Sequence, residues 1–298
     1  MELRHIKYFL AVAEEGNFTR AAQKIGIGQP PLSQQIRDLE REIGVPLFRR
    51  LPHGAELTEA GQAFLPEART LIEQSRQAIR AAQRSGRGEV GQLRVGYTSS
   101  AAFHPIVPQS IRAFRKNSPE VELTLTEADT TKLLELLQCH EVDVAFVRPG
   151  HKAPTGVRLY NLDNEAMFAV LPSGHPLAES QSIQLAQLAE EILLLFPRSA
   201  GTSFFDDIIA ACQHVGFEPI LGQQVPQISS VGNLVAAELG VSIVPETIAQ
   251  VQVAGVKYIP ITGQSPRARL DLATRPNETS IVVHNFIAPL IRTSKHDM

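Results

Sequence analysis

The feature that most limits the fold is a closely spaced series of helical patterns and glycine breaks at the start of the chain. Apolar residues recur at helical spacing over residues 3–13, and Asn17 or Thr19 can then cap a short second helix. A tight turn follows at residues 26–28, after which Pro30 stands where the first turn of a helix needs no amide donor. This succession predicts a helix-turn-helix unit.

The third helix of this unit has one apolar and one polar face. Leu32, Ile36 and Leu39 form the apolar stripe. The polar face carries Gln29, Ser33, Gln34, Arg37 and Arg41. On an isolated helix, ordinary solvation would be the better explanation of such residues, but amide, hydroxyl and guanidinium groups also bind base edges and phosphates in a major groove.

A hairpin follows the third helix and favours the second explanation. Residues 47–58 contain Pro52 and Gly54 between two short extended segments. The order of elements is that of a winged helix-turn-helix: a short helix, a glycine turn, a helix with a polar face and a hairpin that carries arginines.

Four segments resemble the opening of LysR-type transcription regulators: LRHIKYFLAVAEEGNFTRAAQKI, GQPPLSQQIRDLEREIG, VPLFRR and LTEAGQAFLPEAR. The resemblance implies DNA-binding roles in the major groove for Gln29, Pro30, Ser33, Gln34 and Arg37, and on the wing for Arg50 and His53. Gly28, His53 and Ala55 stand where serine, arginine and valine are common in the family. None of these departures disables the motif, and glycine is a tolerated N-cap.

A long helix is predicted after the hairpin, because residues 58–86 contain no turn signal except Pro66, which should kink it. Its apolar stripe has no partner nearby, so the simplest use is pairing with a second copy. We therefore divide the chain into a winged helix-turn-helix domain (1–58), a linker and dimerisation helix with a hinge (59–88), and an effector-binding domain (89–298).

Strand-like runs alternate with helical stretches in the last part of the chain, which predicts mostly parallel α/β sheets. These runs are 93–97, 121–126, 142–147, 168–171, 192–196, 241–244 and 268–274. This part resembles, more loosely, the co-inducer domain of the same family. The resemblance implies a two-lobed α/β effector domain like the type II periplasmic binding proteins, with lobe one at 92–162 plus 267–298, lobe two at 163–266, and a ligand cleft between them. The whole chain is thus expected to be a multidomain α+β protein.

Donor groups for a carboxylate ligand occur where strands end in the predicted lobe one. Ser99 and Ser100 follow the first strand and precede a helix, a common anion-binding location. Thr130 lies in the turn after the second strand, where capping the next helix is an equally good explanation. Arg148 ends another strand, and its alternative role is a salt bridge with a neighbouring acid.

In the predicted lobe two, Thr202, Ser203 and Phe204 join a strand to a helix, and Phe204 is placed to cover an aromatic ring. A resemblance to the benzoate- and muconate-responsive branch of the family is strongest at this loop, Ser100, Thr130 and Arg148. It implies an aromatic or dicarboxylic acid as effector.

Composition agrees with this assignment. Residues 1–88 hold 13 Lys and Arg against 10 Asp and Glu, whereas residues 89–298 hold 15 against 21, a modest asymmetry that does not by itself establish nucleic-acid binding. The apolar run near the N-terminus ends at Glu14, too soon for export or membrane spanning. Only Cys139 and Cys212 are present, without metal-ligand spacing, so we expect a cytoplasmic protein with no cofactor.

Three other functions compete with this assignment. An enzyme is disfavoured because the nine histidines are scattered and no nucleophile with a base is evident. A solute-binding protein would leave residues 1–88 without a purpose. A redox-responsive LysR-type regulator would use Cys139 or Cys212, and it remains the alternative.

The expected partners are double-stranded DNA with an inverted-repeat promoter site, a small-molecule effector such as a carboxylate, a second copy in a dimer and tetramer, and RNA polymerase.

Overall fold

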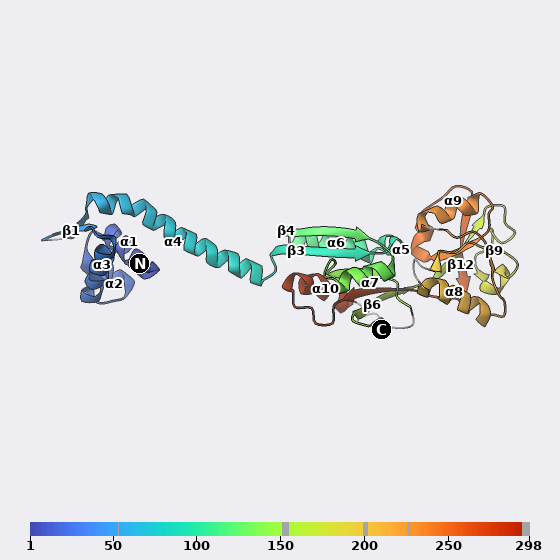
Figure 1. Ribbon diagram of the computed structural model, residues 1–298. Helices are drawn as coiled ribbons and strands as arrows, with labels where there is room; N and C mark the ends of the chain where they lie inside the picture. Colours follow the sequence, from blue (N-terminus) through green and yellow to red (C-terminus); the bar gives the residue numbers. More distant parts are fainter. Residues whose placement is uncertain (53, 151–154, 199–201, 226, 294–298) are drawn as a thin grey trace. The chain divides into compact units, whose positions relative to one another are not determined.

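The computed structural model describes residues 1–52, 54–150, 155–198, 202–225 and 227–293, with the side chains of residues 202–204 and 293 excepted. The chain divides into two compact units, Met1–Arg84 and Ser85–Met298, each with its own core (Figure 1). None of the described helices combines the length and apolarity needed to cross a bilayer.

The first unit consists of helices, a hairpin and the start of a long helix. Its elements are α1 (Leu3–Glu15), α2 (Phe18–Ile25), α3 (Gln29–Ile43), β1 (Phe48–Leu51), β2 (Gly54–Leu57) and most of α4 (Glu59–Gly86). Phe9 of α1 is fully buried, and its ring centroid lies 5.2 Å from that of Phe48 and 5.0 Å from that of Phe64. The aromatic contacts join the helices, the hairpin and α4 in one core, so the predicted winged helix-turn-helix is confirmed.

Local capping explains where these helices begin and end. The Asn17 side chain accepts hydrogen bonds from the amides of Thr19 and Arg20, as predicted for an N-cap of α2. Gly26 ends α2 with a φ of 79°, a left-handed conformation that glycine adopts without strain. The carboxylate of Glu40 on α3 accepts bonds from the amides of Leu47 and Phe48, which fixes the hairpin against the third helix.

Only the first half of α4 packs on this core. A Cβ on Gly61 would lie 2.1 Å from the carbonyl oxygen of Leu47, so only glycine allows this close approach. Ala68 and Ile72 are buried against the same core. Beyond them α4 continues to Gly86 with mostly exposed side chains, and Ile79 is 56% exposed.

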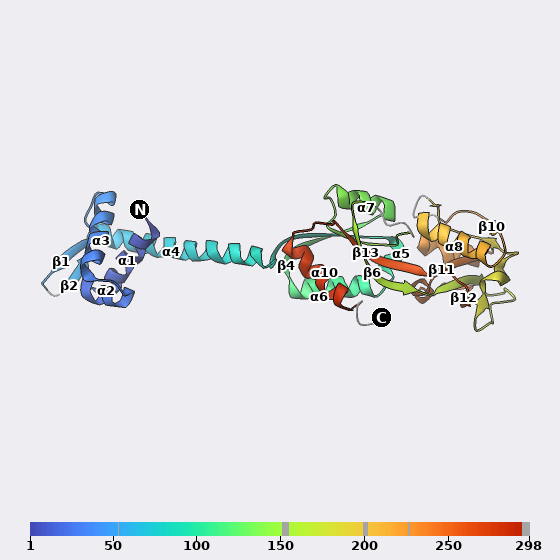
Figure 2. The same ribbon diagram turned by 90° about the horizontal axis from the view of Figure 1, so that it is seen from below.

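Lobe one of the second unit is built on a five-stranded sheet with the order β4-β3-β5-β13-β6. Its elements are β3 (Val90–Tyr97), α5 (Ser99–Ala102), α6 (Ile106–Asn117), β4 (Glu120–Glu127), α7 (Thr130–Gln138), β5 (Val144–Val147), β6 (Arg158–Glu165), β13 (Ala268–Thr274) and α10 (Ile281–Thr293). Helices α6 and α10 cover one face of the sheet and α7 covers the other (Figure 2).

Lobe two is built on a four-stranded sheet with the order β11-β7-β12-β8. Its elements are β7 (Met167–Pro172), β8 (Ile183–Gln184), η1 (Leu185–Leu188), β9 (Ile192–Leu193), α8 (Thr202–His214), β10 (Ile220–Leu221), η3 (Ile228–Ser230), α9 (Val231–Ala236), β11 (Ser242–Pro245), η4 (Glu246–Gln250) and β12 (Val256–Thr262). Residues of α8 pack on one face of β7 and residues of α9 on the other.

The chain crosses between the lobes twice, after β6 and before β13. These two crossover strands pair with each other, and Ala268 lies opposite Glu165 in their register. The sheets are mixed, so the prediction of mostly parallel sheets was correct for β3, β4 and β5, which run parallel, but wrong for the other long strands. Strand β13 runs antiparallel to both of its neighbours, and β7 runs antiparallel to β11 and β12. The reason is that a chain that leaves a lobe and returns by the adjacent strand must reverse its direction there.

The sequence patterns missed the two-residue strands β8 and β10 and the two longer strands β6 and β12. Strand β6 carries polar Asn161, Asp163 and Asn164, and β12 contains Pro260, so neither resembles a buried strand. The predicted strand 192–196 was too long, because β9 ends at Leu193.

Candidate DNA interface and ligand cavity

The third helix exposes most of the side chains that were predicted to read DNA. Pro30, Gln34 and Arg37 are exposed, and Gln29 is half-buried. The opposite face is buried through the predicted stripe of Leu32, Ile36 and Leu39. Alternation of buried and exposed faces follows from the helical period.

Ser33 differs from its neighbours on this face because its side chain is buried, with 4% of the residue exposed. Its Oγ accepts a hydrogen bond of 2.8 Å from Nε2 of Gln29. Its carbonyl oxygen accepts a bond of 3.3 Å from Nε of Arg37. Ser33 therefore orients the half-buried Gln29 and the exposed Arg37 and does not itself present a hydroxyl at the surface.

The exposed side of α3 also carries a local charge network. Asp38 accepts hydrogen bonds from Nε2 of Gln34 and Nη1 of Arg41, at 2.9 and 3.0 Å. The amide and guanidinium groups are thereby held along the helix surface, where the phosphates of a bound duplex would compete for them.

Arg50 lies on β1 of the hairpin, and its guanidinium carbon is 4.7 Å from the ring centroid of Phe18. The amide of Ala55 on β2 donates to the carbonyl oxygen of Gly16, so the hairpin is attached to the end of α1. His53, also predicted for the wing, lies outside the described residues.

A cavity of about 370 Å³, here called the front cavity, lies between the two lobes of the second unit. Lobe one contributes the residues that follow three of its strands, including Ser99, Ser100, Thr130 and Arg148 from the predicted site. Lobe two contributes Phe196, Phe205 and residues 227–229. Three segments that are far apart in sequence thus line one cavity, because the ends of β3, β4 and β5 lie side by side in the sheet.

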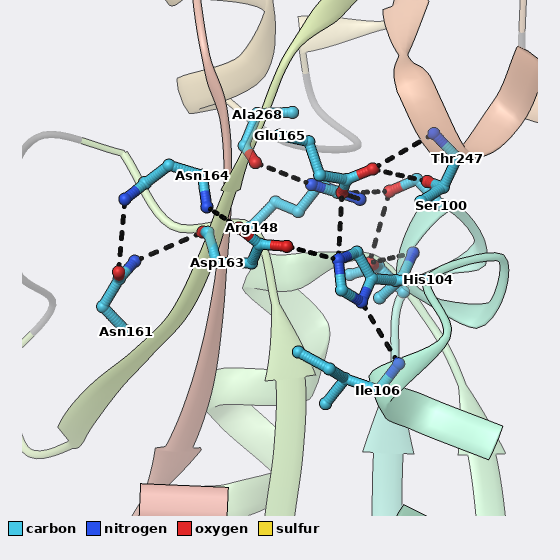
Figure 3. Close-up of polar contacts among 12 residues, drawn as sticks. Ser100, His104, Ile106, Arg148, Asn161, Asp163, Asn164, Glu165, Thr247 and Ala268 are labelled. Atoms are coloured by element: carbon cyan, nitrogen blue, oxygen red, sulfur yellow. Dashed lines mark hydrogen bonds and ion pairs between the residues drawn. The ribbon is translucent and has the colours of Figure 1, made fainter. Parts of the chain in front are cut away.

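The Arg148 side chain forms hydrogen bonds to three residues at the front cavity (Figure 3). The residue is 6% exposed, and its Nη2 lies 2.5 Å from Oε1 of the equally buried Glu165. Its Nε donates to Oγ of Ser100 at 3.0 Å, and its Nη1 donates to the carbonyl oxygen of Ala268 at 3.2 Å. The salt bridge that was left open as the alternative role of Arg148 is therefore formed.

Glu165 connects the two lobes. Its Oε2 accepts bonds from the backbone amide and the hydroxyl of Thr247 in lobe two, at 3.2 and 2.6 Å. Nearby, Nε2 of His104 lies 3.0 Å from Asp163 and its Nδ1 accepts a bond from the amide of Ile106 (Figure 3). Sequence reasoning missed Glu165 and Thr247. The one available signal was an acid directly before the apolar run of β7.

Acidic residues also line the front cavity, which the sequence analysis did not anticipate. Glu127 and Asp129 both belong to its wall. The Asp129 side chain accepts from the amide of Lys132 and caps α7. A carboxylate ligand would be repelled at this end of the cavity and attracted only toward Arg148.

The predicted residues of lobe two are placed only in part. Thr202, Ser203 and Phe204 begin α8, but their side chains lie outside the described ones. The next residue, Phe205, lines the front cavity.

The two cysteines have different environments. Cys139 is exposed at the end of α7. Cys212 is fully buried in lobe two, and this burial raises the pKa of its thiol to about 11. Among the described residues, no group of three or more histidine, cysteine or acidic side chains is placed to hold a metal ion.

A winged helix-turn-helix with an exposed polar third helix, joined in one chain to a two-lobed domain with a cavity between its lobes, is the architecture of DNA-binding regulators that carry an effector-binding domain. Family models agree: residues 3–62 match the bacterial regulatory helix-turn-helix protein of the lysR family, and residues 86–294 match the LysR substrate binding domain. The chain belongs to the LysR family of transcription regulators.

Individual relatives match over nearly the whole chain. The HTH-type transcriptional regulator BudR of Raoultella terrigena is 37% identical over 287 residues, covering 96% of this chain and 99% of BudR. The crystal structure of full-length CbnR in complex with its target DNA has a TM-score of 0.82 at 29% identity and covers 99% of both chains. A full-length OxyR variant from Pseudomonas aeruginosa has a TM-score of 0.69 at 25% identity, covering 98% of this chain and 100% of that one.

Proposed function

We propose that this regulator responds to a small organic acid that binds in the front cavity and changes how the protein binds and bends promoter DNA. The observation that carries the proposal is that residues of both lobes line one cavity in which Arg148 and Ser100 offer donors. A ligand that touches both lobes favours one arrangement of them, and it can shift this equilibrium only by its differential affinity.

The acid would bind at the Arg148 end of the cavity. There its carboxylate competes with Glu165 for the guanidinium and takes a bond from Ser100. Phe196 and Phe205 of lobe two supply the apolar contact for an aromatic or hydrocarbon body. This placement favours an aromatic or dicarboxylic acid, as expected for the benzoate- and muconate-responsive branch.

For DNA binding, we propose direct contacts by Gln29, Pro30, Gln34 and Arg37 of α3 and by Arg50 and His53 of the wing, with Ser33 acting through Gln29. The exposed second half of α4 would pair with a second copy, and pairing of effector domains would complete a tetramer. Two-fold symmetry then requires an inverted-repeat DNA site. RNA polymerase at the same promoter would be the partner whose activity the bound regulator changes.

Redox control is the second candidate, and the similarity to OxyR supports it. Any cysteine response would start at the exposed Cys139, because the thiol of Cys212 is buried with a raised pKa.

The test is a thermal-shift screen of the purified protein against small aromatic and dicarboxylic acids. A ligand of the native state raises the melting temperature. Each hit is titrated against wild type, Ser100→Ala and the control Ser110→Ala, whose hydroxyl bonds within α6. We expect Ser100→Ala to weaken binding and Ser110→Ala to leave it unchanged. If no acid stabilises the protein, the organic-acid proposal fails, and peroxide treatment of wild type and Cys139→Ser then tests the redox candidate.

A further inference from the structure

The second unit contains another cavity between its lobes, and we propose that it is a second ligand site that binds a small organic anion. This rear cavity has a volume of about 670 Å³. Crossover strand β6 contributes Asn164, β13 and the residue before it contribute Arg269 and Arg267, and α8 contributes His214. Such a site goes beyond the proposed function of the front cavity, which uses none of these residues.

The two cavities lie on opposite faces of the crossover strands. Glu165 and Ala268 are opposite each other in the strand register, and both bind Arg148. The adjacent pair in the register is Asn164 and Arg269, whose side chains point the other way because strand side chains alternate. Figure 3 shows the Asn164 side chain extending away from Glu165 and Arg148.

The charges of the rear cavity favour an anion. Arg267 is exposed and forms no ion pair with any residue that the structure describes. Arg269 lies two positions along on the same face, and Asp271 holds its guanidinium through two bonds of 2.7 and 2.5 Å. The Arg269 side chain is still 41% exposed, so it is oriented and accessible at the same time. A guanidinium held in this way binds a carboxylate with little further loss of conformational freedom.

The contrast with the front cavity supports the assignment. Arg148 there is paired with Glu165, while Glu127 and Asp129 add two carboxylates to the wall. In the rear cavity, Asp207 is the acid among the described lining residues and Asp271 pairs with Arg269, so Arg267 is the guanidinium that stays accessible to a ligand. An incoming anion meets an available cation there without displacing a buried partner.

The remaining lining indicates an organic ligand. Pro149, Pro266, Ala210 and Ala211 provide apolar surface beside the arginines. A bare inorganic anion would gain nothing from this surface, whereas the hydrocarbon part of an organic acid is removed from water by it. A dicarboxylate suits the site best, since Arg267 and Arg269 follow each other on one strand face. Because α8 belongs to lobe two and Asn164 to lobe one, such a ligand would contact both lobes.

The experiment is calorimetric titration of the purified full-length protein with succinate, adipate and phthalate, and separately with inorganic phosphate. The variants are Arg267→Ala, the charge-matched control Arg112→Ala on the exposed side of α6, and Ser100→Ala in the front cavity. Arg267 is exposed, so its removal should leave the melting temperature unchanged.

We expect at least one dicarboxylate to bind, with a Kd weakened about tenfold or more by Arg267→Ala and unchanged by Arg112→Ala and Ser100→Ala. Three outcomes would overturn the proposal. The first is no binding of any of the three acids. The second is binding lost with Ser100→Ala but kept with Arg267→Ala, which would place the ligand in the front cavity. The third is phosphate binding as tight as the best dicarboxylate, which would rule out a role for the apolar wall.

Discussion

Nη2 of Arg148 lies 2.5 Å from Oε1 of Glu165, and both side chains are more than nine-tenths buried. The pair joins the end of β5 to crossover strand β6, and Glu165 continues the connection to Thr247 in lobe two. Any ligand that engages Arg148 therefore acts on a contact between the lobes. Truncating Arg148 would take the cationic partner from the buried Glu165 carboxylate, so milder substitutions test this contact better.

Glu165→Gln should increase the affinity for an acidic effector. The amide keeps the shape of the side chain but removes the charge that competes for Arg148, so a ligand carboxylate would bind about tenfold more tightly. Without ligand, the variant should be less stable by about 3 kcal/mol, because a buried guanidinium has lost its counter-charge. Titration and thermal melts measure the two effects. The control is Glu179→Gln, which removes the same charge from an exposed position. Unchanged affinity in Glu165→Gln would show that the ligand does not contact Arg148.

Ser33→Ala should weaken specific DNA binding about three- to tenfold, the value of one hydrogen bond. The hydroxyl holds the amide of Gln29, and without it Gln29 gains rotamer freedom that DNA binding must remove. Binding to operator and random DNA is compared in wild type, Ser33→Ala, Gln29→Ala and the double variant. If Ser33 acts only through Gln29, its substitution in the Gln29→Ala background adds nothing. Additive losses in the double variant would mean that Ser33 contacts DNA itself.

Arg37→Ala should lower specific DNA affinity and leave effector binding intact, since Arg37 is exposed on α3 in the other unit. Loss of a base contact costs about 1–3 kcal/mol and leaves the salt dependence of binding unchanged. Loss of a phosphate contact instead lowers the slope of log affinity against log salt concentration by about one. Binding measured at several salt concentrations separates the two roles. Loss of effector stabilisation in the same variant would argue against separable units.

Asp143→Asn should lower the free energy of unfolding at neutral pH and make that free energy depend less on pH in the acid range. Burial raises the pKa of the Asp143 carboxyl, but bonds from Arg94 and Arg275 outweigh burial and hold that pKa below its ordinary value of 3.8. The unfolded state therefore binds the proton more tightly. The stabilisation is present above the ordinary pKa and is lost as the pH falls through the folded one. We expect a loss of about 3 kcal/mol at pH 7. Urea unfolding between pH 3 and pH 7 measures the free energy of unfolding, and Glu141→Gln, at an exposed position, is the control. If Asp143→Asn loses stability toward low pH as the wild type does, Asp143 is not the source of that pH dependence.

Cys212 should resist alkylation in the native protein. Its thiol has a pKa of about 11, so the reactive thiolate is scarce at pH 8, and the side chain is fully buried. Mass spectrometry after brief iodoacetamide treatment should find label at Cys139 only, and at both cysteines after unfolding. Equal labelling of Cys212 in the folded protein would show that lobe two opens readily and would restore that cysteine as a candidate redox sensor.

The amino-acid sequence by itself determined the elements whose signals are local. The cap at Asn17, the stripe of Leu32, Ile36 and Leu39 and the hairpin around Gly54 depend on neighbouring residues, so the DNA-binding unit could be predicted in detail. The same holds for the strand ends that carry Ser100, Thr130 and Arg148, which were expected and do line one cavity.

Only the tertiary structure decided what those groups contact. The position of Ser33 on the polar face of its helix predicts an exposed side chain, but the packing of the first unit buries it. The partner of Arg148, Glu165, belongs to strand β6, which is too polar to be recognised as a strand from the sequence. Glu165 contacts Arg148 and Thr247 because the crossover strands β6 and β13 pair between the lobes, a long-range arrangement that no local sequence period encodes. The alternation of side chains along these paired strands also separates the front cavity from the rear one, since adjacent residues of one strand face opposite sides.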